Sequence, residues 1–318
     1  MFLKNIMAVK LLVCNYHYIR DVIPRRGIHP ITPSFFEDQL DLIHSNGYEF
    51  ISLHSLNENI KNSNSENLPK KSCLITFDDG LRESYDIGFS IMSKKGIPGA
   101  FFIISDAIHN RKLLDVHKIH YLRSVISDED ILNYFPSLGC NEFSQLDDSV
   151  FLSVYHYDDY RAAKVKYILN FSKRAFVDML FDHFISDDEG KLAEDLYMTK
   201  EQMLDLHSLG FLGTHSDQHL PLATLSKDDI YNDIKCSIQK IENSFGGIVD
   251  SISYPYGDSS SVSDDVISAC SDVGLTSGFT MTRGINDFND IIRSPFMIKR
   301  MDTNDIFNGR HASTYDEL

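Results

Sequence analysis

The sequence predicts an α/β fold in which helices cover a mostly parallel sheet or barrel. Short apolar runs with strand-like composition recur along the chain, and the segments between them carry helical patterns with start and stop signals. Strands that alternate with helices are typical of βαβ units, whose strands pair in parallel. The alternation breaks over residues 105–198, where the patterns are helical. That segment is therefore expected to be an insertion.

Seven strands are expected from the apolar runs, each short and rich in residues that suit a pleated sheet. The expected strands are Ala8–Cys14, Tyr48–Leu53, Ser72–Phe77, Gly99–Ile104, Phe211–His215, Ser251–Tyr254 and Thr276–Thr280.

Three of the intervening segments have clear helix boundaries. Thr32, which a proline follows, supplies an N-cap and a first-turn proline. The sequence from Thr199 to Gln202 forms a capping box, and Ser226 opens a third helix. Glycine follows these helices at positions 47, 210 and 246, as is common at helix C-termini.

The middle of the chain is expected to be a mainly helical insertion over residues 105–198, within a single domain that spans residues 1–318. Helical patterns occur in Arg111–Val125 and Tyr160–Phe184, and the segment is too long for a plain loop. The polar stretch Asn57–Lys71 is expected to be a surface loop.

Composition and charge exclude several classes of protein. The 318 residues include 30 Lys plus Arg and 46 Asp plus Glu, which gives a net charge of −16. Nucleic-acid binding is not expected, because it depends on cations that neutralise phosphates. The five cysteines are widely spaced, so reduced thiols in the cytosol are expected. The apolar run near the N-terminus is too short to span a membrane and lacks a cleavage signal, which favours a cytoplasmic protein.

Two adjacent carboxylates follow the third expected strand. Asp78 and Asp79 come directly after the apolar run, within the sequence TFDDG. Carboxylates at the end of a buried strand are costly to desolvate unless a metal or a basic group binds them. A solvated turn is the alternative that this motif allows by itself.

Two histidines four residues apart follow the fifth expected strand. His215 and His219 would share a face if the chain turns helically there, which suits a metal with nitrogen ligands. Two surface histidines are the alternative. Because the carboxyl ends of parallel strands gather at one side of a barrel or sheet, the two motifs together favour a shared metal site.

Two more segments end expected strands. Tyr254, Pro255 and Tyr256 precede Gly257 and could form no more than a turn. His17 ends the first strand, where a lone histidine is more often packed than catalytic.

Taken together and in this order, TFDDG, H-x-x-x-H and YPYG resemble the motifs of the polysaccharide deacetylase family (NodB homology, carbohydrate esterase 4). The segments 15–19 and 299–305 are similar to one branch of that family. The resemblance covers Ala8–Ile104 and Thr199–Asp305, about two-thirds of the chain. It implies a distorted (β/α) barrel with fewer than eight regular units and a divalent metal cofactor, usually Zn²⁺.

The resemblance also implies roles for single residues. The implied metal ligands are Asp79, His215 and His219. Asp78 would be the general base that takes a proton from water, while the metal polarises the amide carbonyl. The residues implied to line the substrate groove are Tyr254, Pro255 and Tyr256. The backbone N–H of Tyr256 would help to hold the oxyanion.

The sequence departs from the family pattern at three places. Ser253 stands where the family has the arginine that tunes the base, and the chain has no tryptophan. The final leucine-and-histidine motif, which supplies the general acid, is absent, and its neighbourhood reads Ile298–Asp302. His17 is the first candidate for the general acid, followed by His117 and His120 of the insertion.

The expected function is therefore metal-dependent removal of an N-acetyl or N-formyl group from an amino sugar. Because no export signal is seen, an activated sugar precursor for surface polysaccharide is the expected substrate. A barrel that binds carbohydrate without turnover is one alternative. A 2-His-1-carboxylate iron oxygenase, built on His215 and Asp217 with His219 or His311, is another.

Overall fold

Parallel strands form most of the sheet in the computed structural model, which describes residues 9–22, 24, 28–108, 112–134, 174–258 and 261–312. Within these residues nine strands join in the order β7-β6-β5-β4-β3-β1-β8, with β2 beside β3 and β9 beside β1. The strands are β1 (Lys10–Tyr16), β2 (Glu49–Phe50), β3 (Lys71–Phe77), β4 (Gly99–Ile103), β5 (Leu212–Thr214), β6 (Ser251–Ser253), β7 (Ser277–Phe279), β8 (Asn286–Asp287) and β9 (Met301–Asp302).

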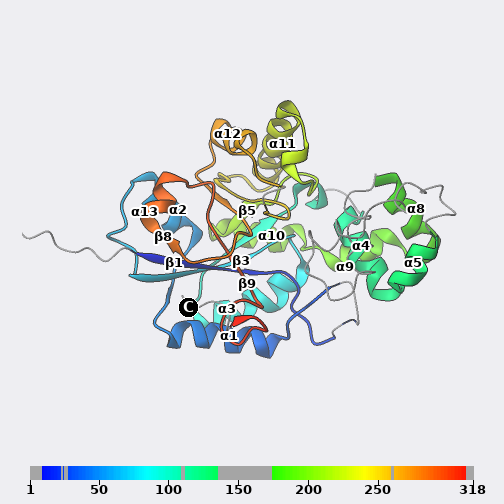
Figure 1. Cartoon of the computed structure of the whole chain (residues 1–318), viewed down its shortest axis with the longest axis horizontal. Helices are drawn as coiled ribbons and strands as arrows, with labels where there is room; N and C mark the ends of the chain where they lie inside the picture. Colours follow the sequence, from blue (N-terminus) through cyan, green and yellow to red (C-terminus); the bar gives the residue numbers. More distant parts are fainter. Residues whose placement is uncertain are drawn as a thin grey trace, which may run out of the picture. The chain divides into compact units, whose positions relative to one another are not determined.

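The sheet curls into a distorted (β/α) barrel, which confirms the expected fold class (Figure 1). Of the strand pairings in the described residues, only β1 with β8 is antiparallel. The segment that contains β9 links β7 with β1. Ile298 bridges in parallel to Phe279 of β7, and β9 pairs in parallel with β1.

The chain forms two compact units. The first comprises the described residues of Met1–Asp21, Pro30–Asn110 and Glu194–Leu318. Its α-helices are α1 (Pro33–Ser45), α2 (Leu53–Lys61), α3 (Ser90–Lys95), α10 (Lys200–Ser208), α11 (Lys227–Phe245), α12 (Asp264–Asp272) and α13 (Phe288–Arg293). Shorter turns are the π-helix η1 (Ser84–Phe89) and the 3₁₀ helices η2 (Ser105–Ile108) and η5 (Leu222–Thr224).

The predicted helix starts are confirmed by their caps. The Thr32 hydroxyl accepts a hydrogen bond from the Phe35 amide at 3.2 Å, at the start of α1. Both hydrogen bonds of the Thr199 capping box are present at the start of α10, and Ser226 caps α11.

Alternating strand residues build two apolar layers, because neighbours on a strand point to opposite faces. Leu12, Ile75 and Phe101 belong to one cluster, which includes buried residues of α1, α10, α11 and α12. Leu11 and Phe102 belong to another, with residues of α2 and α13. Both faces of the central strands are therefore buried, and polar groups at their ends are held in fixed places.

The sequence prediction was wrong around α2. The expected strand Tyr48–Leu53 is reduced to the two residues of β2, and the expected loop Asn57–Lys71 begins inside a helix. Ser52 caps this helix by accepting from the Ser55 amide at 3.0 Å. Leu53, Leu56 and Ile60 form its buried face, a helical pattern that the polar residues between them concealed.

The second unit comprises the described residues of Val22–His29 and Arg111–Ala193. Its helices are α4 (Asp115–Val125), α5 (Asp128–Tyr134), α8 (Arg174–Phe184) and most of α9 (Glu189–Leu196). Buried Lys118 of α4 lies 2.5 Å from Asp178 and 3.1 Å from Glu189, which ties α4 to α8 and α9. The part of the expected helix Tyr160–Phe184 before residue 174 lies outside the described residues. In the described part of the chain, no helix is both long and apolar enough to cross a membrane.

Candidate active site

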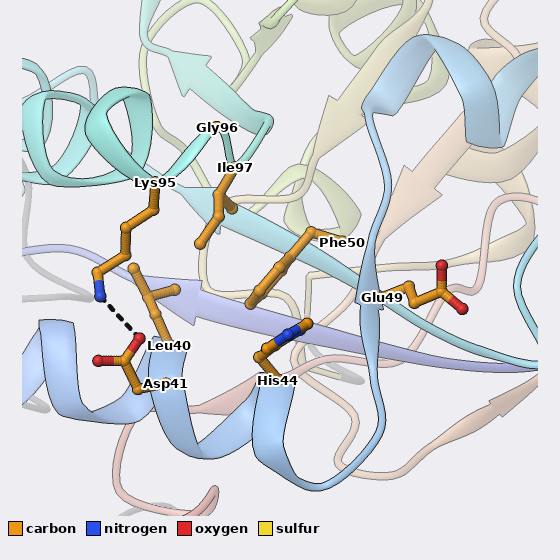
Figure 2. A pocket seen from close by; sticks show the side chains of 8 residues that line it. All are labelled: Leu40, Asp41, His44, Glu49, Phe50, Lys95, Gly96 and Ile97. Atoms are coloured by element: carbon orange, nitrogen blue, oxygen red, sulfur yellow. Dashed lines mark hydrogen bonds and ion pairs between the residues drawn. The ribbon is translucent and has the colours of Figure 1, made fainter.

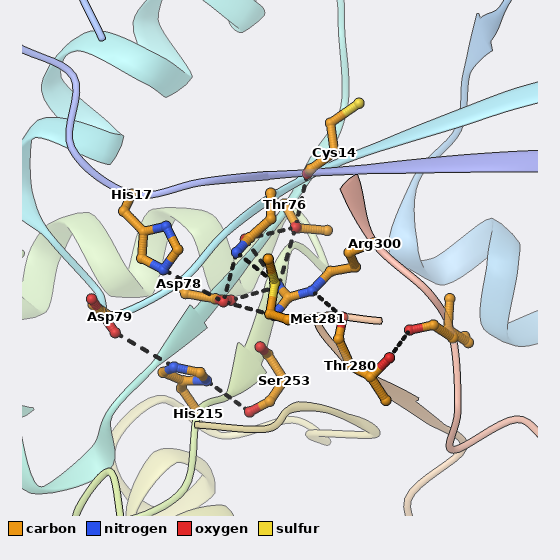
Figure 3. A network of polar contacts seen from close by, with 12 residues as sticks. Cys14, His17, Thr76, Asp78, Asp79, His215, Ser253, Thr280, Met281 and Arg300 are labelled. Atoms are coloured by element: carbon orange, nitrogen blue, oxygen red, sulfur yellow. Dashed lines mark hydrogen bonds and ion pairs between the residues drawn. The ribbon is translucent and has the colours of Figure 1, made fainter. Parts of the chain in front are cut away.

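The predicted motifs meet at the carboxyl ends of parallel strands. Asp78 and Asp79 follow β3, His215 follows β5, and His17 follows β1. Parallel strands place these ends on the same side of the barrel, so residues far apart in the sequence come together. Figure 3 shows Asp78 and Asp79 close to His215, although β4 separates the strands β3 and β5 that these residues follow.

Asp79, His215 and His219 form a cluster of metal-binding donors. Asp79 Oδ1 lies 3.4 Å from His215 Nε2 and 3.5 Å from His219 Nε2. One donor atom from each residue lies within 4.8 Å of the others, and all three residues are buried. This is the largest gathering of such donors found in the described residues. One carboxylate and two imidazoles suit a divalent ion such as Zn²⁺ and leave coordination positions for water and substrate.

The ring of His215 is oriented by the neighbouring strand. Its Nδ1 lies 2.7 Å from the carbonyl oxygen of Ser253, at the end of β6. With a proton on Nδ1 donated to this carbonyl, Nε2 faces Asp79 with its lone pair, as a metal ligand requires. Burial disfavours the imidazolium, but the negative charges of Asp78 and Asp79 raise the pKa of His215. The same field favours a bound cation in the cluster.

The backbone is strained where it presents these groups. Among the described residues, six other than glycine have positive φ. Four of them belong to the site: Asp79 (φ 73°), Ser216 (66°), His219 (55°) and Tyr256 (63°). Such conformations cost about 1–3 kcal/mol each in the least favourable cases and gather at functional sites. Gly80 also has a positive φ, and a Cβ there would lie 3.1 Å from Ile103.

Asp78 is held by a buried guanidinium that the sequence did not predict. Arg300 Nη1 donates to Asp78 Oδ1 at 3.0 Å, and Nη2 lies 2.9 Å from Oδ2. Arg300 is fully buried, and its Nε donates to the carbonyl oxygen of Thr280 at 3.0 Å. Burial alone would raise the pKa of Asp78, but the charge of Arg300, with His215 and His17, lowers it to about 2.

Asn15 completes this network, and it too was missed. Its Nδ2 donates to Asp78 Oδ2 at 3.2 Å, while its Oδ1 accepts from Arg300 Nη1 at 2.9 Å and from Thr76 Oγ1 at 3.2 Å. The signal in the sequence was the missing arginine at position 253. Arg300 lies 47 positions further on, next to β9, and only the pairing of that segment between β7 and β1 brings it to Asp78.

His17 lies next to Asp78, with its Nε2 3.9 Å from Asp78 Oδ2 and its side chain 36% exposed. It follows β1 directly and can reach both solvent and the carboxylate. His117 lies in α4 of the second unit with its side chain buried, and its expected role stays a prediction. The ring centroid of His120 lies 6.0 Å from that of His117.

The predicted groove segment after β6 divides into buried and accessible parts. The Tyr254 side chain is fully buried, and its hydroxyl donates to the Phe296 carbonyl at 3.1 Å. Burial raises the pKa of Tyr254 well above its usual value. Pro255 is also buried, whereas Tyr256 is partly exposed and its ring centroid lies 5.0 Å from that of His219. Of the three residues expected to contact the substrate, only Tyr256 is partly exposed, so the expected contact is limited to Tyr256.

Asp217 does not join the donor cluster. Its carboxylate lies against Ser105 and Lys240 instead, at 2.5 and 2.7 Å. The arrangement of His215 with Asp217 that an iron oxygenase of this type needs is therefore not assembled.

A pocket of about 450 Å³ lies elsewhere, beside the amino end of β4 (Figure 2). It is lined by Leu40, Asp41, His44, Glu49, Phe50, Lys95, Gly96 and Ile97. Lys95 pairs with Asp41 at 2.7 Å, and none of the predicted site residues takes part. Because sites on parallel barrels form at the carboxyl ends of strands, this pocket is not the candidate active site.

The chain belongs to the polysaccharide deacetylase family, a class of hydrolases that remove acetyl groups. The family model described as "Polysaccharide deacetylase" matches residues 65–127 and 157–278, more than half of the chain. The comparison with curated protein sequences gave no significant match.

Solved structures share the fold at low sequence identity. The deacetylase PplD of Streptococcus pyogenes, solved in complex with acetate, is 15% identical with a TM-score of 0.60, over 98% of this chain and all of PplD. A de-N-acetylase of Aggregatibacter actinomycetemcomitans is 15% identical with a TM-score of 0.60, over 96% of this chain and 99% of that one. IcaB of Ammonifex degensii is 16% identical with a TM-score of 0.60, over 98% of this chain and 99% of IcaB.

Proposed function

We propose that this chain is a metal-dependent N-deacetylase that hydrolyses the acetamido group of an amino sugar. The proposal rests on one observation: a buried carboxylate held ionised by Arg300 lies beside a cluster of one carboxylate and two imidazoles. The reaction consumes one water, breaks the amide C–N bond and yields a free amino sugar and acetate.

In this proposal Asp79, His215 and His219 hold a divalent ion, most simply Zn²⁺. When bound, such an ion polarises a carbonyl and makes its water more acidic. Asp78 accepts the proton of the attacking water as general base, and its low pKa keeps it in the ionised form that this role requires. Arg300 and Asn15 orient the Asp78 carboxylate through the hydrogen bonds described above.

The leaving nitrogen must gain a proton, and we assign this role to His17. Its ring lies close to Asp78 yet keeps contact with solvent, so it can exchange protons with water between turnovers. Tyr256 is proposed to contact the substrate at the rim, with its backbone N–H directed at the developing oxyanion.

The substrate class is proposed from the family and the chemistry of the site. Family membership points to a polysaccharide, whereas an activated sugar precursor was expected from the sequence. Both candidate substrates contain an N-acylated amino sugar. Release of acetate from N-acetylglucosamine oligomers and from a nucleotide-linked N-acetylated sugar, measured side by side, separates the two sources. Release of formate from an N-formyl analogue tests the acyl group.

The test combines metal content with turnover. The purified full chain should contain close to one equivalent of divalent metal and release acetate. Asp78→Asn should keep the metal and lose about 10²–10⁴-fold in turnover, the usual contribution of a general base. Asp79→Asn should lose the metal. Metal binding without acetate release from any acylated amino sugar would favour a barrel that binds carbohydrate without turnover, and full activity in Asp78→Asn would overturn the assignment of the base.

A further inference from the structure

The loop between the two histidines of the donor cluster is strained and closely held. Ser216 and His219 both have positive φ, which residues with a side chain rarely adopt. Within the loop, the Ser216 hydroxyl accepts from the His219 amide at 3.0 Å, and the ring centroids of His215 and His219 lie 4.9 Å apart. A hydrogen bond of this kind contributes less than two such conformations cost. Other parts of the barrel must therefore hold this loop.

The Asp217 side chain makes several of these contacts. It is buried, and its Oδ1 accepts from Ser105 Oγ at 2.5 Å and from Lys240 Nζ at 2.7 Å. Lys240 also reaches Asp217 Oδ2 at 3.0 Å and Asp106 Oδ1 at 3.2 Å. Partial burial would lower the pKa of Lys240, but its bonds to Asp217 and Asp106 raise it, so the ammonium stays charged.

The backbone of the loop is fixed by the same two elements. The Ser105 and Asp106 amides of η2 donate to the carbonyl oxygens of Ser216 and Asp217, at 3.2 and 3.1 Å. From α11, the Asp233 carboxylate accepts from the Asp217 amide at 3.0 Å. The histidine loop is thus tied to α11 on one side and to the end of β4 on the other.

We propose that Asp217 and Lys240 are positioning residues that fix the spacing of His215 and His219 and thereby set the metal affinity of the site. Neither side chain belongs to the donor cluster, so both act through the loop. This inference rests on the proposed metal site. Removing outer contacts of this kind typically weakens metal binding about 10–100-fold.

Substitution of Lys240 distinguishes two explanations, which predict opposite changes in metal affinity. Removing a positive charge near a cation site strengthens metal binding if Lys240 acts only through its field. Removing the contact that holds the loop weakens binding if Lys240 positions the histidines. Lys240→Met should therefore bind Zn²⁺ about 10–100-fold more weakly than the wild type, and Lys240→Arg, which keeps a cation at this place, should stay within a few-fold of it.

The measurement uses the full-length apoprotein, with Zn²⁺ affinity determined by competition with a chelator and thermal unfolding recorded for each variant. Lys227→Met is the matched control, because Lys227 begins the same helix and pairs with Asp265 at 2.7 Å from an exposed position. Its affinity should equal that of the wild type. If Lys240→Met does not fold, Ser105→Ala, which removes the Ser105 hydroxyl donor to Asp217, takes its place with the same expectation.

A spectroscopic readout separates positioning from stability alone. Co²⁺ in the site should give a visible spectrum that changes in Lys240→Met and not in Lys227→Met, because the spectrum reports ligand geometry. Unchanged affinity and spectrum in folded Lys240→Met, or tighter binding, would overturn this inference and leave the proposed function intact. A wild-type protein that binds neither ion would overturn both.

Discussion

Arg300 is the side chain that pairs with the proposed general base, Asp78. It is fully buried, and Asp78 is its charged partner. A carboxylate buried without such a partner is costly. Removing only one member of the pair should therefore destabilise the protein more than removing both charges. The lowered pKa of Asp78 means that ionisation of this group favours the folded state above pH ~4, and that this contribution is lost as the pH falls towards 2.

Arg300→Met should be inactive and less stable by about 3–5 kcal/mol at pH 7, because it leaves the Asp78 charge buried and uncompensated. Urea unfolding and acetate release measure the two effects. Asp78→Asn combined with Arg300→Met should recover a large part of the stability but no activity. Arg293→Met serves as control, since Arg293 forms an exposed pair with Asp290. A double variant as unstable as Arg300→Met would contradict this account.

Asp233 predicts a pH dependence of stability. Burial, together with the charge of Asp217, raises its pKa from 3.8 to about 6. The folded state therefore binds the proton more tightly than the unfolded state, and stability falls as the pH rises from about 4 to 6. Asp233→Asn can still accept the Asp217 amide but carries no charge. At pH 7 its free energy of unfolding, measured with urea, should exceed that of the wild type by up to about 3 kcal/mol. At pH 3 the two free energies should be equal.

Asp228→Asn is the control for this effect, because it removes an exposed carboxylate from the same helix. Its stability should follow the wild type at both pH values. An equal gain for Asp233→Asn at pH 3 and pH 7 would mean that the proton on Asp233 is not the cause.

The segments that follow β1 and β3 support each other. The Glu83 carboxylate accepts from the Ile19 amide at 2.7 Å and lies 2.7 Å from Nη2 of Arg20. The Ser84 hydroxyl donates to the carbonyl oxygen of His17 at 3.3 Å. The backbone at His17, the proposed general acid, and just after it is thus held by the segment that follows Asp78 and Asp79.

Glu83→Gln should lower kcat roughly ten-fold or more, because a shift of about 1 Å in a catalytic group can cost 10²-fold in rate. Its metal content should not change, since none of the donor residues contacts Glu83 in the described hydrogen bonds. Steady-state kinetics and metal analysis check both statements. Lys95→Met, which breaks a comparable ion pair with Asp41 away from the site, should leave kcat as it is. A Glu83→Gln enzyme with wild-type kcat would show that this contact does not position His17.

The residues of the candidate site lie at the ends of different strands of the barrel. Asp79 follows β3, the histidines follow β5, and Arg300 lies on the segment that links β7 with β1. An ion bound at the proposed site would therefore join strands that are not neighbours in the sequence, and a ligand that binds only the folded state stabilises it.

Removal of metal with a chelator should lower the melting temperature by several degrees. At free metal a hundred times the dissociation constant, binding contributes about 2.7 kcal/mol of stability. Differential scanning calorimetry with and without Zn²⁺ measures this shift. Asp79→Asn should melt at the same temperature in both conditions. A shift of equal size in that variant would indicate metal binding somewhere else on the chain.

Local patterns were sufficient for much of this protein. The caps at Thr32, Thr199 and Ser226 act over three or four residues, so the sequence predicts these helix starts directly. The motifs at 78–79 and 215–219 could be placed because each follows its strand at once. The α2 helix was missed because polar residues separate Leu53, Leu56 and Ile60, and burial of that face depends on the rest of the core.

The fold class and the donor residues of the candidate site could thus be read from order along the chain, because strand ends in a parallel barrel share one side. The charged partner of Asp78 could not be predicted in this way. Arg300 reaches Asp78 only because the segment around β9 pairs between β7 and β1, and Asn15 joins them from β1. Likewise, Tyr254 and Tyr256 are two residues apart, yet one is buried in the core and the other is partly exposed. Contacts between segments that are distant in the sequence depend on strand pairing and packing, and no local pattern records them.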